Sequence, residues 1–170
     1  MKRHIIGLLG TANSGKDTAG NYLISNHQFT RYAFGDPVKD ICKTLFSLSN
    51  LQLSDPSMKE TVDERWGLRP RDMFQRIGTE FGQMGILTLF PELKNKIKYR
   101  ELWVTLFEEW LKQQEHTNIV ITDVRFKHEI DYIKKYGGTI IKINRTTSKN
   151  DTHLSETEIN LIPDDMIDHV

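Results

Sequence analysis

One stretch near the N-terminus constrains the fold of this chain more than any other. The apolar run His4–Leu9 leads into a loop bounded by Gly10 and Gly15, and Lys16 follows at the start of helix-forming sequence. Glycines let the backbone turn tightly enough for successive N–H groups to point at phosphate oxygens, and the N-terminus of the next helix adds partial positive charge. This order is typical of a nucleotide-binding phosphate loop, or P-loop. The alternative, a turn that happens to use glycine and lysine, does not explain why the full motif spacing is matched.

The residue after the lysine departs from the standard motif. A Ser or Thr hydroxyl normally follows the lysine and binds Mg²⁺, whereas this chain has Asp17 and then Thr18. Because one residue turns about 100° around a helix, Thr18 does not simply replace the missing hydroxyl. We expect Lys16 to reach the terminal phosphates of ATP, and the Asp17 carboxylate to lie near the metal and the transferred phosphoryl group. The alternative for Asp17 is only a favourable charge in the first helical turn.

Composition excludes several classes of protein. The 170 residues, 38% of them hydrophobic, suffice for one core, so a single domain over residues 1–170 is the simplest organisation. Lys plus Arg and Asp plus Glu both number 23, so no basic field indicates binding to nucleic acid or membranes. The single cysteine, Cys42, excludes an internal disulfide, and the first apolar run is too short to cross a bilayer. We expect a soluble cytoplasmic protein.

Strands alternate with helices along the rest of the chain. Further strands are expected at residues 29–34, 118–126 and 139–144, and helices at about 18–25, 99–114 and 127–136, with two more opening at Pro37 and Pro70. This order favours an α/β fold with a parallel sheet covered by helices on both faces. Residues 167–170 look like the first half of another strand, which predicts a sheet without its last edge.

An apolar strand that ends in a carboxylate follows the P-loop in sequence. Residues 118–126 carry Asp123 near their end. The carboxyl ends of strands in such sheets face the nucleotide, so this is the pattern of a Walker B segment that orients a metal ion. Many strands end in Asp, and the position after a P-loop is what favours the metal-orienting interpretation.

Two expected helix starts carry side chains suited to a ligand. Asp36 and Lys39 follow a strand, a common place for ligand contacts in open α/β sheets, although helix capping explains Asp36 and a solvated helix face explains Lys39. The second start concentrates hydrogen-bond donors, namely Arg69, Arg71, Gln75 and Arg76. Guanidinium forks suit phosphate or a planar base edge, and the alternative is again a solvated helix face.

Two polar stretches are candidates for moving parts. Residues 47–70 are rich in turn-forming residues and suit either a mobile flap over a substrate pocket or an ordinary surface excursion. The run at residues 146–153 suits a lid over ATP, which would exclude water from phosphoryl transfer. His153 and Glu156 are candidate nucleotide contacts, although a capping box at residues 155–158 explains this segment without any ligand.

Taken together, these segments resemble the viral type of deoxynucleoside monophosphate kinase, within the P-loop nucleoside monophosphate kinase superfamily. They are residues 10–18 with the Ser-Gly-Lys-Asp-Thr ending, Phe34–Lys39, Arg69–Arg71 with Gln75–Glu80, Asp123–Phe126 with Glu129, and His153–Glu156. The resemblance covers nearly the whole chain in the right order. It includes the unusual Asp17, since the family carries Gly-Lys-Asp-Thr.

The resemblance implies a P-loop kinase fold with a mostly helical substrate-binding insertion and a short lid. The core would lie at about residues 1–46 and 117–170, the insertion at about 47–116 and the lid at about 145–155. The implied reaction transfers the γ-phosphoryl group of ATP, with Mg²⁺, to a deoxynucleoside 5′-monophosphate. If the protein is viral, as the resemblance implies, its expected location is the host cytoplasm. The strand and helix that the family carries further on are absent after Val170, which puts adenine packing in doubt.

The resemblance also assigns site residues. The ATP site would consist of Gly10, Asn13, Ser14, Gly15, Lys16, Asp17, Thr18 and, from the lid, Arg145. The monophosphate site would consist of Asp36, Lys39, Arg71, Gln75, Arg76, Thr79, Arg125 and Glu129. The catalytic residues would be Lys16, Asp17, Asp123 and Arg125, with Asp17 and Asp123 near Mg²⁺.

Two other functions remain open from the sequence. Animal-type phosphomevalonate kinase resembles the same pattern, with its Ser-Gly-Lys-Asp loop and an Asp-x-Arg strand end, although residues 71–80 favour a nucleotide kinase. A non-catalytic nucleotide-binding module is the second alternative, but Lys16, Asp17, Asp123 and Arg125 are all present. The sequence leaves open which bases are accepted, whether ribose is rejected, and whether the protein is a monomer or a homodimer.

Overall fold

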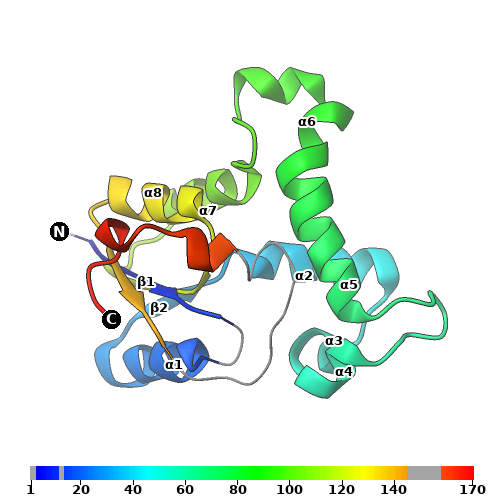
Figure 1. The fold of residues 1–170 in the computed structure, drawn as a ribbon, viewed down its shortest axis with the longest axis horizontal. Coiled ribbons are helices and arrows are strands. Elements are labelled where there is room, and N and C mark those ends of the chain that lie inside the picture. The colour runs from blue at the N-terminus through cyan, green and yellow to red at the C-terminus, as the bar shows by residue number, and fades with distance from the viewer. Residues whose placement is uncertain (1–2, 12–13, 145–157) are drawn as a thin grey trace. The chain divides into compact units, whose positions relative to one another are not determined.

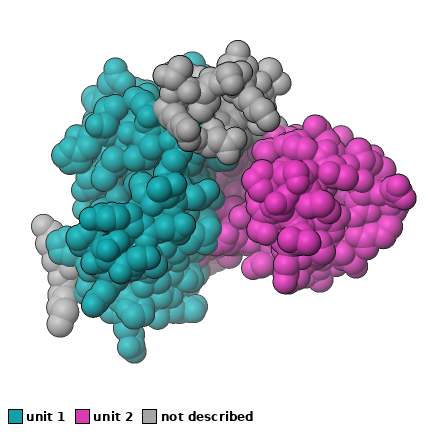
Figure 2. All heavy atoms as spheres, turned by 90° about the horizontal axis from the view of Figure 1, so that it is seen from below, with its two compact units in different colours: residues 1–34, 107–170 teal, residues 35–106 magenta. Residues whose placement is uncertain are grey.

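The structure, a computed structural model, describes residues 3–11, 14–144 and 158–170. By its internal contacts the chain divides into two compact units (Figure 2). Residues 1–34 and 107–170 form what we call the sheet unit, and residues 35–106 form the helical unit. The division into a core at 1–46 and 117–170 and an insertion at 47–116 stays a prediction. Asn13, Arg145, His153, Glu156 and the predicted lid lie outside the described residues.

A four-stranded parallel sheet forms the centre of the sheet unit. Its strands are β1 (His4–Leu9), β2 (Thr30–Tyr32), β3 (Asn118–Val124) and β4 (Thr139–Lys142), in the order β2-β3-β1-β4. Ile5 of β1 lies opposite Ile119 of β3, and Gly7 lies opposite Ile140 of β4. Apart from the half-buried Ile6, the apolar side chains of the inner strands are buried, as a sheet covered on both faces requires. The predicted α/β fold with a parallel sheet is confirmed.

Helices α1 (Lys16–His27) and α8 (Lys127–Lys135) cover opposite faces of this sheet (Figure 1). Neighbouring residues of a strand point to opposite faces. A Cβ on Gly7 would lie 2.9 Å from Ile133 of α8, whereas the side chain of the next residue, Leu8, lies 3.7 Å from where a Cβ on Gly20 of α1 would be. None of the helices in the described ranges is long and apolar enough to cross a membrane.

The last residues of the chain lie against β4. His169 forms a parallel bridge with Ile141, and its carbonyl oxygen accepts a hydrogen bond of 2.8 Å from the Lys142 N–H. The Asp168 carboxylate accepts the Ile140 N–H at 2.7 Å and pairs with Lys134. The strand-like pairing predicted for residues 167–170 is therefore present at His169. Two short 3₁₀ turns, Glu158–Leu161 and Asp164–Met166, precede it.

The helical unit contains one long helix of mixed geometry, which consists of α5 (Pro70–Gln75), the π-helical segment Arg76–Gly85 and α6 (Ile86–Leu89). The other elements of the unit are α2 (Gly35–Phe46), α3 (Asn50–Ser54), α4 (Pro56–Glu60), the 3₁₀ turn Pro91–Asn95 and the start of α7 (Leu102–Lys112). The π-helical segment packs against Trp103, whose indole Nε1 donates to the Gly78 carbonyl oxygen at 2.7 Å. A Cβ on Gly82 would lie 2.2 Å from the Trp103 ring, so only glycine fits there.

Two predicted elements differ in the structure. The polar stretch 47–70 contains α3 and α4, because Ser49 and Gln52 form a capping box and Asp55 caps the second helix through the N–H groups of Ser57 and Met58. The helix expected at 99–114 begins only at Leu102. Arg100 has a φ of 67°, a left-handed conformation that no helix interior tolerates.

Candidate active site

The loop after β1 has the geometry that its glycines predict. Gly15 closes it with a φ of 108°, in the region that favours glycine, and α1 begins at the next residue. A Cβ on Gly10 would lie 2.6 Å from the Ile143 carbonyl oxygen and 2.7 Å from Ser14 Oγ, which is too close for any other residue. The strand, loop and helix predicted for this region are all present.

Lys16 lies inside this loop. Its side chain is buried, and its Nζ donates to the carbonyl oxygens of Gly10 and Thr11, both at 2.6 Å. An ammonium carries three donors and is costly to bury without partners. These two carbonyl oxygens thus hold the charge next to the N-terminus of α1. Phosphate oxygens arriving at this loop would meet a positive charge already in place.

Ser14 provides a second polar group in the loop. Its Oγ is buried, and within the described part of the chain no hydrogen-bond partner for it is present. A buried hydroxyl without a partner costs about 1–3 kcal/mol, so such a group points to a ligand. A phosphate oxygen would accept this hydroxyl proton. The next two predicted residues, Asp17 and Thr18, are exposed on the first turn of α1.

Asp123 lies near the carboxyl end of β3, beside the end of β1. Strand pairing places its neighbour Val124 opposite Leu9, the last residue before the P-loop. The Oδ1 atom of Asp123 accepts a hydrogen bond of 2.8 Å from the Phe34 N–H, just after β2. The carboxylate therefore links two strands, and it lies at the sheet edge from which the P-loop emerges.

Arg125 and Phe126 form the short turn between β3 and α8. Their N–H groups both donate to Oε2 of Glu129, at 2.7 Å and 3.0 Å. Glu129 is only 3% exposed. Burial and the nearby Asp123 carboxylate raise the pKa of Glu129 to about 8, although the two N–H groups and Arg125 favour its charged form. The predicted site residue Glu129 therefore contacts the backbone of the predicted site residue Arg125.

A groove of about 660 Å³ runs beside the P-loop in the sheet unit. Its lining comes from the loop, α1 and β4, namely Leu8, Ser14, Gly15, Thr18, Ala19, Tyr22, Leu23, Ile141 and Ile143. Most of these side chains are apolar. The groove therefore offers apolar surface next to the loop, of the kind that a flat aromatic ligand group covers.

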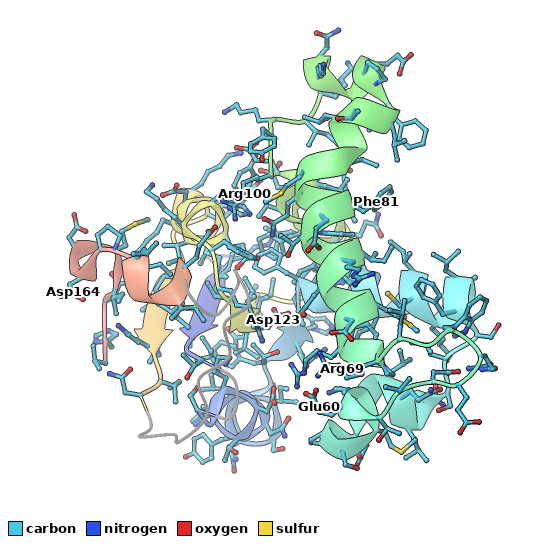
Figure 3. The ribbon with its side chains drawn as sticks, turned by 45° about the vertical axis from the view of Figure 1, so that its right-hand side comes forward. Glu60, Arg69, Phe81, Arg100, Asp123 and Asp164 are labelled. Atoms are coloured by element: carbon cyan, nitrogen blue, oxygen red, sulfur yellow. The ribbon has the colours of Figure 1, made fainter. Side chains whose placement is uncertain are left out.

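The donors predicted for a second ligand lie in the helical unit, and two of them, Arg69 and Arg71, are held by ion pairs. Arg69 forms a two-pronged pair with Asp72, at 2.9 Å and 2.7 Å, and also approaches Glu60 at 3.3 Å (Figure 3). Arg71 pairs through its Nε with the same Glu60. The sequence gives no sign of this partner, because Glu60 lies eleven positions before Arg71 in a turn-rich segment. Exposed pairs of this kind contribute about 0–1 kcal/mol each.

The remaining predicted residues of the helical unit divide by exposure. Arg71, Gln75 and Thr79 recur every four positions along the helix, a spacing that places them near one face. Thr79 is buried, Gln75 is half-buried, and Arg76 is exposed. Near the start of α2, Asp36 and Lys39 form a partly exposed ion pair of 3.7 Å. These side chains share a unit with one another, whereas the P-loop, Asp123 and Arg125 belong to the sheet unit.

Asp17 and Asp123 are the two carboxylates predicted to lie near Mg²⁺. Within the described residues, no cluster of three or more His, Cys, Asp or Glu side chains lies together. Mg²⁺ in phosphoryl-transfer sites is usually held by one or two carboxylates together with substrate phosphates. The two predicted carboxylates, Asp17 and Asp123, fit that smaller ligand set.

Comparison with known proteins agrees with this geometry. A family model described as "Deoxynucleotide monophosphate kinase" matches residues 63–168. A "Putative deoxynucleotide monophosphate kinase" of Acanthamoeba polyphaga mimivirus is 40% identical over 163 residues, which covers 93% of this chain and 83% of the relative. A "Deoxynucleoside-5'-monophosphate kinase" of Escherichia phage T5 is 23% identical over 179 residues, which covers 77% of this chain and 72% of the relative.

Proposed function

The chain belongs to the deoxynucleotide monophosphate kinase family, a family of phosphotransferases, and from that premise we propose how its own residues perform the transfer. The donor is ATP, and the acceptor is the 5′-phosphate of a deoxynucleoside monophosphate. The observation that carries the proposal is the P-loop, which holds Lys16 buried among its own carbonyl oxygens and Ser14 without a partner in the described residues. Membership of this family disfavours the two alternatives, a phosphomevalonate kinase and a non-catalytic module.

ATP binding would use the P-loop and the start of α1. The proposed ligands are Gly10, Asn13, Ser14, Gly15, Lys16, Asp17 and Thr18, with Arg145 as an eighth. Phosphate oxygens that enter the loop would meet the Lys16 ammonium, and the Ser14 hydroxyl would gain an acceptor. The groove lined by Tyr22, Leu23 and Ile141 supplies apolar surface for the nucleoside.

Mg²⁺ bound to the ATP phosphates would neutralise charge that develops on them during transfer. Asp17 on the first turn of α1 and Asp123 at the end of β3 are the proposed ligands, directly or through water. The Phe34 N–H donates to Oδ1 of Asp123 and orients this carboxylate at the end of β3. No residue needs to deprotonate the acceptor, because a phosphate is a nucleophile at neutral pH.

The acceptor would be bound by Asp36, Lys39, Arg71, Gln75, Arg76 and Thr79, with Arg125 contacting the reacting phosphates. Arg71 uses its Nε for Glu60, so its two terminal nitrogens remain to grip a phosphate in the two-pronged manner typical of arginine. Positioning and charge neutralisation then supply the rate.

The direct test measures ADP release with Mg²⁺, ATP and a panel of acceptors. The panel contains each deoxynucleoside monophosphate, its ribose counterpart and phosphomevalonate. We expect turnover with one or more deoxynucleotides, and none when EDTA removes Mg²⁺. Silence with every deoxynucleotide while ATP still binds, or turnover with phosphomevalonate alone, would contradict the proposal. Sedimentation of the same sample decides between monomer and homodimer.

A further inference from the structure

A buried oxygen atom of Glu129 binds the turn between β3 and α8. β3 ends at Val124 and α8 begins at Lys127, so the turn consists of Arg125 and Phe126. Both backbone N–H groups of this turn donate to Oε2 of Glu129, at 2.7 Å and 3.0 Å. One carboxylate oxygen therefore satisfies every N–H group between the last residue of the strand and the first residue of the helix.

Glu129 is poorly placed to bind a substrate. Its side chain is almost completely buried, and the oxygen that is shown in hydrogen bonds points at the turn. It also lies near the Asp123 carboxylate, and a buried carboxylate beside another carboxylate is costly unless hydrogen bonds compensate. A substrate contact through Oε2 would require this oxygen to release the two N–H groups, which would open the turn.

The rest of the turn is fixed as well. Val124 is paired with Leu9 in the sheet, and the Phe126 carbonyl oxygen accepts hydrogen bonds from the N–H groups of Glu129 and Ile130, at 3.1 Å and 3.2 Å. Phe126 is buried, whereas Arg125 is partly exposed. The direction in which the Arg125 side chain leaves the backbone is therefore set by the buried hydrogen bonds of its neighbours.

We propose that Glu129 is a positioning residue that holds the backbone of Arg125 for phosphoryl transfer, and is not a ligand of the substrate. The inference rests on the proposed function, because it takes Arg125 as the residue that contacts the reacting phosphates. Misplacing such a group by about 1 Å costs on the order of 10²-fold in rate. The sequence assigned Glu129 to the substrate through its motif, and burial together with the two N–H contacts is what changes that assignment.

Two substitutions separate the length of the side chain from its ability to ionise. Glu129→Gln keeps the length and an oxygen that accepts both N–H groups, but cannot ionise. Glu129→Asp is still an acid but is one methylene shorter. We expect kcat within about threefold of wild type for Glu129→Gln, and a loss on the order of 10- to 100-fold for Glu129→Asp, with little change in KM for either nucleotide. The reverse order, or a rise in the KM for the deoxynucleotide alone, would overturn the proposal.

A double substitution tests whether the effect passes through Arg125. In an Arg125→Ala background, Glu129→Asp should lower kcat no further, while its effect on the melting temperature should persist. If the two losses in kcat instead multiply, Glu129 acts independently of Arg125 and the proposal fails. Ile133→Val, which removes a buried methyl group from α8 away from the turn, is the control for general destabilisation and should leave kcat unchanged. If Arg125→Ala alone has wild-type kcat, the proposed role of Arg125 fails, which is a separate result.

Discussion

The two units hold their proposed phosphate-binding groups in different ways. In the sheet unit, Lys16 is buried against two backbone carbonyl oxygens, and the turn carrying Arg125 is fixed by the buried Glu129. In the helical unit, Arg71 is held by the exposed carboxylate of Glu60. A buried hydrogen bond to the main chain fixes one geometry, whereas an exposed ion pair exchanges partners at little cost. The difference indicates rigid groups for the transferred phosphoryl group and exchangeable groups for the acceptor.

We expect the largest effect on kcat from removing the buried charge in the P-loop. Lys16→Ala should lower kcat on the order of 10²–10³-fold, because it removes one preorganised donor to the developing charge. Steady-state kinetics with saturating nucleotides measures it. Lys112→Ala, which removes an exposed lysine that pairs with Glu109 three positions before it, is the matched control and should have wild-type kcat. Near-normal turnover of Lys16→Ala would show that the charged group of the P-loop does not contribute to catalysis.

A substitution that disturbs packing in the helical unit should have a smaller effect, but one that is still large enough to measure. Gly82→Ala places a methyl group 2.2 Å from Trp103 and should lower the free energy of unfolding by about 1–3 kcal/mol. Gly78→Ala, in the same helix, meets its nearest neighbour at 3.5 Å and should leave stability unchanged or raise it slightly. Urea unfolding of both variants makes the comparison. Equal stability of the two would mean that Trp103 does not fix this helix, and that the helical unit is adaptable in its packing as well as in its ion pairs.

Removing the exchangeable arginine should affect binding more than turnover. Arg71→Ala should raise the KM for the deoxynucleotide about 10- to 100-fold, the loss expected when a charged two-pronged contact to phosphate is removed, with kcat little changed. Arg65→Ala, an arginine of the same unit that pairs with Asp63, serves as the control. A fall in kcat without a change in KM would place Arg71 among the rigid groups and break the contrast between the units.

The smallest effect should come from Glu60, the ion-pair partner of Arg71. Glu60→Gln frees Arg71 from competition and should lower the KM for the deoxynucleotide about two- to threefold, in line with the small free energy of an exposed ion pair. Glu64→Gln, an exposed residue nearby in sequence, makes the same change in net charge and controls for it. A higher KM in Glu60→Gln alone would show that Glu60 orients Arg71 and does not compete with the substrate.

Local patterns in the sequence predicted the sheet unit well. The P-loop depends on glycines and a lysine at fixed spacing, and the parallel sheet follows from strands that alternate with helices. Each of these signals lies within a few residues of the element it predicts. The positions of Gly10, Gly15 and Lys16 agree with the geometry that the motif requires.

Long-range contacts explain what the sequence did not predict. The π-helical segment Arg76–Gly85 packs against Trp103, about twenty residues further along the chain, and no local pattern predicts that geometry. The pairing of Glu60 with Arg71 crosses a turn-rich segment. The two short helices at 50–60 carry capping residues, Ser49 with Gln52 and Asp55 before Pro56. Because each helix has only five residues, however, the sequence shows no apolar periodicity that would predict it.

The most direct test of the central claim identifies the product of the reaction. The protein is mixed with ATP, Mg²⁺ and the deoxynucleoside monophosphate that gives the fastest ADP release, and the phosphorus signals are followed by ³¹P NMR. The account predicts that ATP and the monophosphate disappear together as ADP and the deoxynucleoside diphosphate form. ATP conversion to ADP and inorganic phosphate, with the monophosphate left unchanged, would contradict it.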